Sequence, residues 1–295
     1  MKRTLSALLD QAIGKLERAG VSYGHGTANA LDEAAWLILH SLGLPPTDLT
    51  AHLDDALTQA QWDAATKLVE RRIRTRKPAA YLLHEAWLGP HRFYVDERVI
   101  VPRSYIAELL QNRGQTPFFR QEEKRGLSPV SVLDLCTGSG CLAILAALRF
   151  PAASVDAADI SADALEVAKR NVHDYKLGDR VRLVRSDLFK SLTGRKYDLI
   201  VSNPPYVTAA AMARLPEEYR KEPAMALASG ADGLEHTRTI LRDAKRYLNP
   251  GGTLVVEIGR NRKALEKAYP KLPFEWPKTS AGRGYVFELK RDELA

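Results

Sequence analysis

Cysteine is scarce in this sequence, which has only Cys136 and Cys141 among its 295 residues. Two cysteines this close together, with no partners elsewhere, make neither a disulfide framework nor a set of metal ligands. The seven histidines are scattered without the spacing of a ligand set. We therefore predict no metal site, and we expect a reducing, cytoplasmic location.

Long hydrophobic runs are also missing. The sequence has no stretch of about 18 apolar residues, so no transmembrane helix and no membrane partner are predicted. The first residues lack the unbroken apolar segment and small-residue cleavage site of a signal peptide, so none is expected. Apolar residues still make up 45% of the chain. That share is enough to bury a core, and the length suits two domains.

Acidic residues are the minority among the charged ones, with 36 Asp and Glu against 43 Lys and Arg, which leaves a net charge of +7. This balance favours anionic partners such as RNA or a ribonucleoprotein, although a solvated basic surface explains it equally well. Five basic residues lie between Arg71 and Lys77. They could make a weak RNA contact or could form the solvated end of a helix.

Residues 1–86 are predicted to form a small helical N-terminal domain for substrate recognition. Apolar residues recur at three-and-four spacing over residues 5–16 and 31–39, and a third helix is predicted over residues 59–76. Residues 87–104 are predicted to be a hairpin linker, with strands at 93–95 and 99–101. The polar stretch 111–129 is predicted to be a surface loop.

Residues 105–295 show alternating strand and helix patterns. Strands are predicted at residues 132–135, 154–159, 181–185, 197–202 and 253–258, with helices at 141–148, 162–175 and 233–248. Such alternation predicts an α/β fold, with a mainly parallel sheet covered by helices on both faces. A late strand at 285–289 has no helix after it, so it should lie antiparallel at or near an edge.

A glycine loop follows the first strand of this sheet, in the run Val132-Leu133-Asp134-Leu135-Cys136-Thr137-Gly138-Ser139-Gly140. Glycines there let the backbone approach a ligand closely and adopt positive φ. Asp159 ends the next strand 19 residues after Gly140, where a carboxylate can accept both hydroxyls of a ribose. This pairing also describes a dinucleotide site.

Two further acidic residues help to separate the alternatives. Asp134 faces the loop, where a carboxylate would repel a pyrophosphate but attract the amino group of a methionine moiety. The sequence therefore favours a cofactor without phosphates. Asp187 follows the third strand and could receive an adenine amino group, with Leu188 covering the ring. Asp187 could instead be an ordinary helix cap before Lys190.

The run Asn203-Pro204-Pro205-Tyr206 directly follows the fourth strand. Two prolines make this corner rigid. The Asn203 side-chain oxygen and the Pro204 carbonyl can both accept hydrogen bonds, which suits the two protons of a planar NH₂ group. Tyr206 would stack on that group. The pattern indicates methylation of an amide or amine nitrogen by positioning and electrostatics, without a covalent intermediate. An unremarkable proline turn is the alternative.

These motifs resemble the class I S-adenosylmethionine-dependent methyltransferases, and within them the glutamine N(5)-methyltransferase family that modifies release factors and ribosomal protein L-three. The resemblance also rests on Arg76-Lys77-Pro78-x-x-Tyr81-Leu82, Glu222-Pro223-x-x-Ala226-Leu227, Gly233-Leu234 and Glu257-Ile258-Gly259. It implies a Rossmann-like sheet, S-adenosylmethionine as cofactor and S-adenosylhomocysteine as product. Cofactor-binding residues are then expected to be Asp134, Cys136, Thr137, Gly138, Gly140, Asp159, Asp187, Leu188 and Asn203. Asn203, Pro204, Pro205 and Tyr206 would hold the acceptor glutamine, and Arg103 and the hairpin would help to form the rim.

The segment before the catalytic part is similar to the ribosomal-protein branch of that family. The release-factor branch typically has isoleucine-proline-arginine-proline, whereas this chain has Val101-Pro102-Arg103-Ser104, with Glu85-Ala86-Trp87 upstream. Tyr105 departs from the branch's usual proline and could alter the rim. The expected substrate is a glutamine of a large-subunit ribosomal protein, free or within a ribosomal precursor.

Three other functions remain open from the sequence. A release-factor glutamine methyltransferase would share every chemical motif. A DNA or RNA adenine N6-methyltransferase would also present acceptors to a planar NH₂ group, but the helical N-terminal part carries no recognisable nucleic-acid motif. A non-catalytic module that binds nucleotide-like ligands would not need the Asn203 corner. Trp87 could touch substrate, and the role of Glu257 is open.

Overall fold

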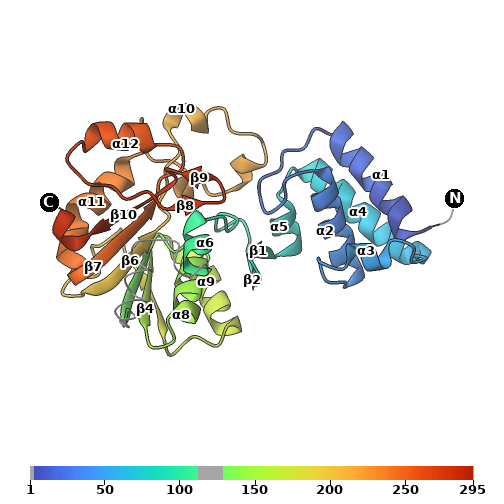
Figure 1. Cartoon of the computed structure of the whole chain (residues 1–295). Helices are drawn as coiled ribbons and strands as arrows, with labels where there is room; N and C mark the ends of the chain where they lie inside the picture. Colours follow the sequence, from blue (N-terminus) through green and yellow to red (C-terminus); the bar gives the residue numbers. More distant parts are fainter. Residues whose placement is uncertain (1–2, 112–128, 295) are drawn as a thin grey trace.

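The computed structural model describes residues 3–111 and 129–294. A group of helices from the first part of the chain lies beside an α/β part, and the short strands β1 and β2 lie between them (Figure 1). The predicted surface loop at 111–129 falls almost entirely outside the described residues. No helix in the described ranges is long and apolar enough to cross a membrane.

The helical part contains α1 (Leu5–Arg18), α2 (Ala30–Leu42), α3 (Leu49–His52), α4 (Gln59–Thr75) and α5 (Ala79–Leu83). α1, α2 and α4 pack together through their apolar faces. Capping side chains fix their starts: the Thr58 and Gln61 side chains form a capping box on α4. α4 ends one residue before the predicted limit because Arg76 adopts a φ of 55°. Its guanidinium then donates to the Ala19 and Gly20 carbonyls.

The connecting hairpin is present, but its predicted position at residues 93–101 is wrong. It consists of β1 (Ala86–Leu88) and β2 (His91–Phe93), which pair antiparallel. Residues 96–99 form a turn without paired strands on either side. The backbone N–H groups of Tyr94 and Val101 instead donate to the side chains of Asn171 and Glu222. Contacts distant in sequence thus replace the strand pairing.

The α/β part contains one six-stranded sheet, with the order β10-β7-β6-β3-β4-β5. Its strands are β3 (Ser131–Leu135), β4 (Ser154–Asp159), β5 (Val181–Arg185), β6 (Tyr197–Ser202), β7 (Leu248–Glu257) and β10 (Val286–Lys290). β10 pairs antiparallel with β7 at one edge, and the other neighbours are parallel. The predicted mainly parallel sheet with a late antiparallel edge strand is confirmed. β7 begins five residues earlier than predicted, and its register against β6 shifts between the pairs Tyr197–Leu248 and Leu199–Thr253.

Helices cover both faces of this sheet, as predicted (Figure 1). The helices of this part are α6 (Tyr105–Gln111), α8 (Cys141–Arg149), α9 (Ala162–Asp174), α10 (Ala209–Met212), α11 (Glu235–Tyr247) and α12 (Arg262–Ala268). α6 and α8 pack in one apolar core, whereas α11 and α12 pack in a second. Short elements complete the chain: η1 (Tyr219–Lys221), η2 (Ala224–Ala226), β8 (Lys278–Thr279), β9 (Gly282–Arg283) and η3 (Arg291–Glu293).

The sheet has a switch point between β3 and β6. The chain continues from β3 to β4 and β5 on one side, then returns to β6 and β7 on the other. Leu135 and Ser202 pair at the carboxyl ends of β3 and β6. The two loops that follow these strands therefore leave the sheet side by side. Ligands of open α/β sheets bind at such a point.

Candidate active site

The glycine loop after β3 has a strained backbone that opens onto a cleft. Cys136, Gly138 and Gly140 all have positive φ, of 60°, 55° and 81°. A Cβ on Gly140 would lie 3.1 Å from the Ala168 Cβ, so glycine lets α8 and α9 pack closely. A Cβ on Gly138 would meet nothing within 4 Å, so this glycine serves the left-handed conformation itself. Cys136 adopts the same conformation with a side chain, a strain typical of functional loops.

Asp159 ties the glycine loop to the end of β4. One carboxylate oxygen accepts the Gly138 N–H at 2.9 Å, and the other accepts the Ser161 N–H at 2.9 Å. Burial raises the pKa of Asp159, although these backbone donors oppose the shift. Each oxygen keeps a further lone pair. The carboxylate can thus hold the loop and still accept hydroxyl groups from the cleft that it lines.

Asp134 and Thr137 lie beneath the loop. Asp134 is fully buried, and its Oδ2 accepts the Thr137 hydroxyl at 2.5 Å and the Ala143 N–H at 3.0 Å. Its Oδ1 is buried without a hydrogen-bond partner among the residues that the structure describes. Burial raises the pKa of Asp134 to about 7. Such an unpaired oxygen can accept a hydrogen bond from a cationic group brought to the loop.

A cleft of about 320 Å³ lies against this loop, and we call it the glycine-loop cleft. Its lining includes Cys136, Gly138, Asp159, Asp187, Leu188 and Asn203. Ile160 and Met225, two of the large apolar side chains that are exposed, also face it. The structure thus places six of the nine predicted cofactor residues along this cleft. Gly140, at the end of the loop, packs against Ala168 and does not line the cleft, and Asp134 and Thr137 lie below the loop.

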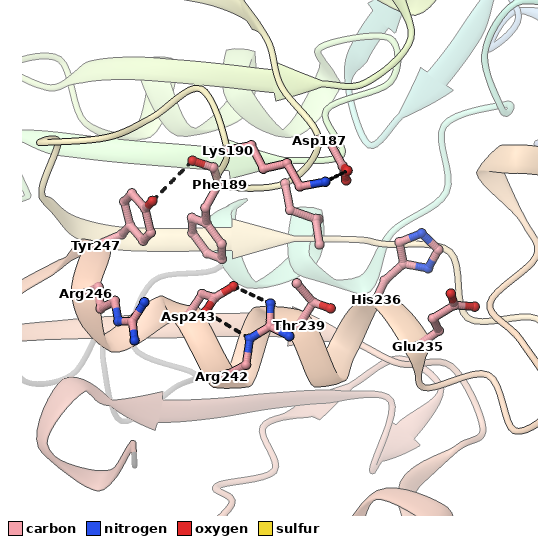
Figure 2. Close-up of a pocket in the computed structure, with 11 residues that line it drawn as sticks. Asp187, Phe189, Lys190, Glu235, His236, Thr239, Arg242, Asp243, Arg246 and Tyr247 are labelled. Atoms are coloured by element: carbon pink, nitrogen blue, oxygen red, sulfur yellow. Dashed lines mark hydrogen bonds and ion pairs between the residues drawn. The ribbon is translucent and has the colours of Figure 1, made fainter.

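A second hollow, of about 350 Å³, lies beside that cleft along α11 (Figure 2). Figure 2 shows Lys190 bound to Asp187 and Arg242 bound to Asp243. Both cations therefore already have a carboxylate partner. Asp187 lines both spaces, and its carboxylate accepts the Lys190 ammonium at 2.6 Å. The predicted adenine contact of Asp187 would compete with this ion pair.

The corner after β6 places Asn203 between two spaces. Asn203 lines the glycine-loop cleft and also a small pocket of about 150 Å³ that Arg103, Pro204, Tyr206 and Tyr219 help to line, the proline-corner pocket. Its Nδ2 donates to the Arg103 carbonyl at 3.2 Å. Because a carbonyl only accepts, this bond fixes which end of the amide faces Arg103. The Asn203 Oδ1 consequently points away from Arg103 and remains an available acceptor.

Glu222 holds the segment that orients Asn203, and sequence reasoning assigned it no role. Its buried carboxylate accepts the Val101 N–H and binds the Arg103 guanidinium through both oxygens at 2.6 Å. Burial acts against this charge, but the bonds from Arg103 and His25 outweigh it and lower the pKa of Glu222 to about 2. His25 comes from the helical part and lies 3.5 Å from Glu222. The carboxylate therefore joins both parts of the chain at the site.

Tyr206 sits in a space left by two glycines of the recognised motifs. A Cβ on Gly259 would lie 2.6 Å from the Tyr206 ring, and one on Gly233 would lie 2.4 Å from the Tyr206 carbonyl. Asn261 Nδ2 donates to that same carbonyl at 2.7 Å. Burial raises the pKa of Tyr206, so the phenol remains protonated. The corner is thus held from behind as well as stiffened by its prolines.

The chain is similar to known proteins along almost its whole length. Residues 7–83 match the family model of the PrmC N-terminal domain, and residues 121–233 match that of the methyltransferase small domain. The ribosomal protein uL3 glutamine methyltransferase of Neisseria meningitidis serogroup B is 54% identical over 99% of this chain and 94% of its own length. That of Burkholderia pseudomallei is 50% identical over 99% and 96%. The chain belongs to the uL3 glutamine methyltransferase family. The resemblance stated from the sequence is confirmed.

The methyltransferase fold also has a counterpart among solved structures. The crystal structure of the hMettl16 catalytic domain in complex with MAT2A 3′UTR hairpin 6 aligns with a TM-score of 0.51 and 13% identity. The alignment covers 81% of this chain and 84% of that one. At this identity the likeness concerns the fold alone. It agrees with the Rossmann-like sheet observed in this methyltransferase.

Glu257, whose role is open from the sequence, lies at the methyltransferase site between Tyr206 and the start of α6. It is buried at the end of β7, and its Oε2 accepts the Ser104 hydroxyl at 2.7 Å and the Tyr105 N–H at 2.9 Å. Its Oε1 lies 3.4 Å from the Tyr206 hydroxyl. Burial raises the pKa of Glu257 to about 7, although the bond from Ser104 opposes it. Glu257 thus ties the start of α6 to the proline corner.

Replacing Gly259 by alanine tests whether the seat of Tyr206 matters. The new Cβ would collide with the ring at 2.6 Å. We expect methyl transfer to fall about tenfold or more, because a shift of about 1 Å at a positioned group costs this much. Gly194→Ala is the control, since Gly194 has a similar positive φ of 79° but nothing within 4 Å. An equal loss of turnover in both variants would show that backbone strain, and not the collision with the Tyr206 ring, causes the loss.

Proposed function

We propose that this protein transfers a methyl group from S-adenosylmethionine to the side-chain amide nitrogen of a glutamine in ribosomal protein uL3. One observation carries the chemical part of this proposal. The Asn203 amide is clamped to the Arg103 carbonyl, beside both the glycine-loop cleft and the proline-corner pocket. Its free oxygen can then hold an acceptor NH₂ group next to a cofactor. The substrate follows from the relatives, which are named for uL3.

The residues around the glycine loop fit S-adenosylmethionine. Asp159 lines the cleft with spare lone pairs for ribose hydroxyls. The unpaired Asp134 Oδ1 suits a cationic amino group, directly or through water. Ile160 and Met225 offer apolar surface for the purine. Asp159 and Asp187 line the cleft and Asp134 lies below its loop, while Arg98, the one arginine among the described lining residues, is paired with Asp96. These carboxylates favour a positively charged sulfonium compound over a pyrophosphate.

The chain's contribution to the reaction is positioning. The cofactor supplies an electrophilic methyl group on a positively charged sulfur. A glutamine amide is a weak nucleophile because its nitrogen lone pair is delocalised into the carbonyl. Acceptance of its NH₂ protons by Asn203 and the Pro204 carbonyl concentrates electron density on the nitrogen and aims it at the methyl carbon. The nitrogen–carbon bond forms as the sulfur–carbon bond breaks, and the amide proton then leaves to water.

The parts of the chain divide this work in our proposal. Residues 1–86 recognise the substrate, residues 87–104 link the two larger parts, and residues 105–295 bind the cofactor and hold the acceptor glutamine. We place this activity in the cytoplasm, because the two free cysteines suit a reducing compartment.

Transfer of labelled methyl groups tests the function. The purified protein is incubated with labelled S-adenosylmethionine and, separately, with uL3, a release factor, ribosomal RNA and DNA, and labelled proteins are analysed by mass spectrometry. We expect label on one glutamine of uL3. Label only on the release factor would support that branch, and label only in nucleic acid would reject a protein substrate. A comparison of free uL3 with assembled particles tells which state is used.

Replacing Asp159 by alanine tests the cofactor assignment. Loss of charge-assisted hydrogen bonds, each about 1.5–3 kcal/mol, should raise the Kd for S-adenosylmethionine by about 10- to 150-fold. Calorimetry measures it directly. The matched control is Asp163→Ala, because Asp163 is exposed in the first turn of the next helix. An unchanged Kd for Asp159→Ala would remove Asp159 from the cofactor site.

A further inference from the structure

A third space adjoins the active site on the side of the helical part, and we call it the hairpin groove. It has a volume of about 450 Å³. Gly24 and Gly26 from the loop after α1, Trp87 and Gly89 from the hairpin, and Glu108 from α6 are among its lining residues. Among its lining residues, Trp87 and Tyr105 were named from the sequence as possible substrate or rim residues, whereas Gly24, Gly26 and Glu108 were not. The groove is formed jointly by the helical part, the hairpin and the α/β part.

The hairpin groove shares two lining residues with the acceptor site. Arg103 and Tyr206 line both this groove and the proline-corner pocket. Asn203 in turn lines both that pocket and the glycine-loop cleft. The three spaces are therefore neighbours, and the residues at the acceptor position lie between the other two. A glutamine held at the corner belongs to a polypeptide whose neighbouring residues need a surface to lie on, and the hairpin groove is such a surface next to the corner.

Trp87 is an exposed aromatic side chain held in a fixed orientation at this groove. It is 36% exposed, and its indole N–H donates to Glu85 Oε1 at 2.8 Å. The same oxygen accepts the Trp36 indole N–H at 3.1 Å, and Arg92 lies 3.5 Å from the other oxygen. Glu85 thus anchors the Trp87 ring to the helical part. A rigid, exposed tryptophan is the kind of side chain that dominates binding to a protein partner.

The charges of the hairpin groove favour a peptide over a nucleic acid. Its lining contains two carboxylates, Glu108 and Glu257, and one cation, Arg103. Arg103 is already bound by both oxygens of Glu222. Glu108 binds the Ser280 backbone and hydroxyl, so it is fixed at the groove. Phosphates would find no uncompensated cation among the described lining residues, whereas apolar or basic side chains would be accepted.

We propose that the hairpin groove binds the extended segment of the substrate protein next to the acceptor glutamine, and that Trp87 stacks on an apolar or cationic side chain of this segment. This inference rests on the proposed function, because it names how the same site selects its polypeptide. Trp87 is then a specificity-determining residue and takes no part in the transfer step itself.

Peptides of increasing length test the proposal with Trp87→Ala. Peptides centred on the methylated glutamine are extended on either side, and kcat and KM are measured with each. For the wild type, KM should fall as the peptide lengthens. For Trp87→Ala, KM for the long peptides and for uL3 should rise about tenfold or more, since truncation of a central tryptophan commonly costs this much. The shortest peptide and the Kd for S-adenosylmethionine should be unaffected.

The control variant is Leu148→Ala, which shortens an exposed apolar side chain on α8 that does not line the groove. Peptide affinity is also measured calorimetrically with S-adenosylhomocysteine present, which does not depend on turnover. Equal KM and affinity for Trp87→Ala and the wild type would overturn the groove assignment, as would an equal loss for short and long peptides. Absence of label on uL3 with the wild type would reject the proposed function separately.

Discussion

Replacing Asn203 by alanine is expected to lower methyl transfer at least about 100-fold while the protein still binds its cofactor. The variant loses the acceptor that holds the glutamine NH₂ group, and removal of one positioned polar group at a reacting centre costs about 10²- to 10³-fold in kcat. Asn203 is only one of several residues that line the glycine-loop cleft, so the Kd for S-adenosylmethionine should rise less than about tenfold. Single-turnover transfer to uL3 and calorimetry measure the two quantities.

A matched control for this variant lies at the other end of the sheet. Asn249 also donates through Nδ2, to Asp198 at 2.8 Å, near the amino ends of β6 and β7. Asn249→Ala removes the same atoms and should keep turnover close to the wild type. If Asn203→Ala kept near-normal turnover, the acceptor assignment would be wrong.

A second substitution at the same position separates the two ends of the amide. Asn203→Asp keeps an oxygen acceptor but replaces the Nδ2 donor by a second oxygen, which would face the Arg103 carbonyl at 3.2 Å. Two acceptors cannot bond, so the side chain should turn away from its clamp. We expect turnover below that of the wild type even though an acceptor remains. Full activity of Asn203→Asp would show that the Arg103 clamp is unnecessary.

The sequence was most informative where local pattern and structure coincide. Apolar spacing predicted α1, α2 and α4 and every strand of the large sheet, because each buries one face or lies in the centre of a core. The absence of a helix after residue 289 predicted the antiparallel edge strand β10. The glycine loop and the proline corner were recognisable because each requires particular residue types at adjacent positions.

The parts that could not be predicted depend on contacts between distant residues. The runs at 93–95 and 99–101 have strand-like composition, yet their backbone donors bond Asn171 and Glu222, which lie 77 and 121 residues away. Glu222 belongs to a motif recognised from the sequence, but spacing alone does not pair it with Arg103. Gly259 and Gly233 also belong to recognised motifs, but the sequence does not explain why glycine is needed there. The structure does, because the Tyr206 ring and carbonyl leave no room for a Cβ at these positions. Tertiary contacts here outweigh local propensity.

Replacing Arg72 by methionine is expected to destabilise the folded protein by about 3–5 kcal/mol. Arg72 is fully buried on α4, where its guanidinium binds Glu33 at 2.7 Å, Glu218 at 3.3 Å and the Ser22 carbonyl at 3.0 Å. Burial raises the pKa of Glu33, and the charge of Arg72 opposes that shift. Without Arg72, buried carboxylates lose their compensating charge, which is a costly change in a protein interior. Urea denaturation followed by tryptophan fluorescence measures the loss.

The control for Arg72→Met is Arg74→Met, because Arg74 is exposed on the same helix, where substitutions usually change stability by less than about 0.5 kcal/mol. These two variants also test whether the basic residues between Arg71 and Lys77 contact RNA. Arg72 and Arg76 bind Glu218, and Lys77 binds Glu97. Three of the five cations therefore form ion pairs within the chain, and the other two, Arg71 and Arg74, are exposed. If Arg72→Met changed RNA affinity but left stability intact, this internal role would be refuted.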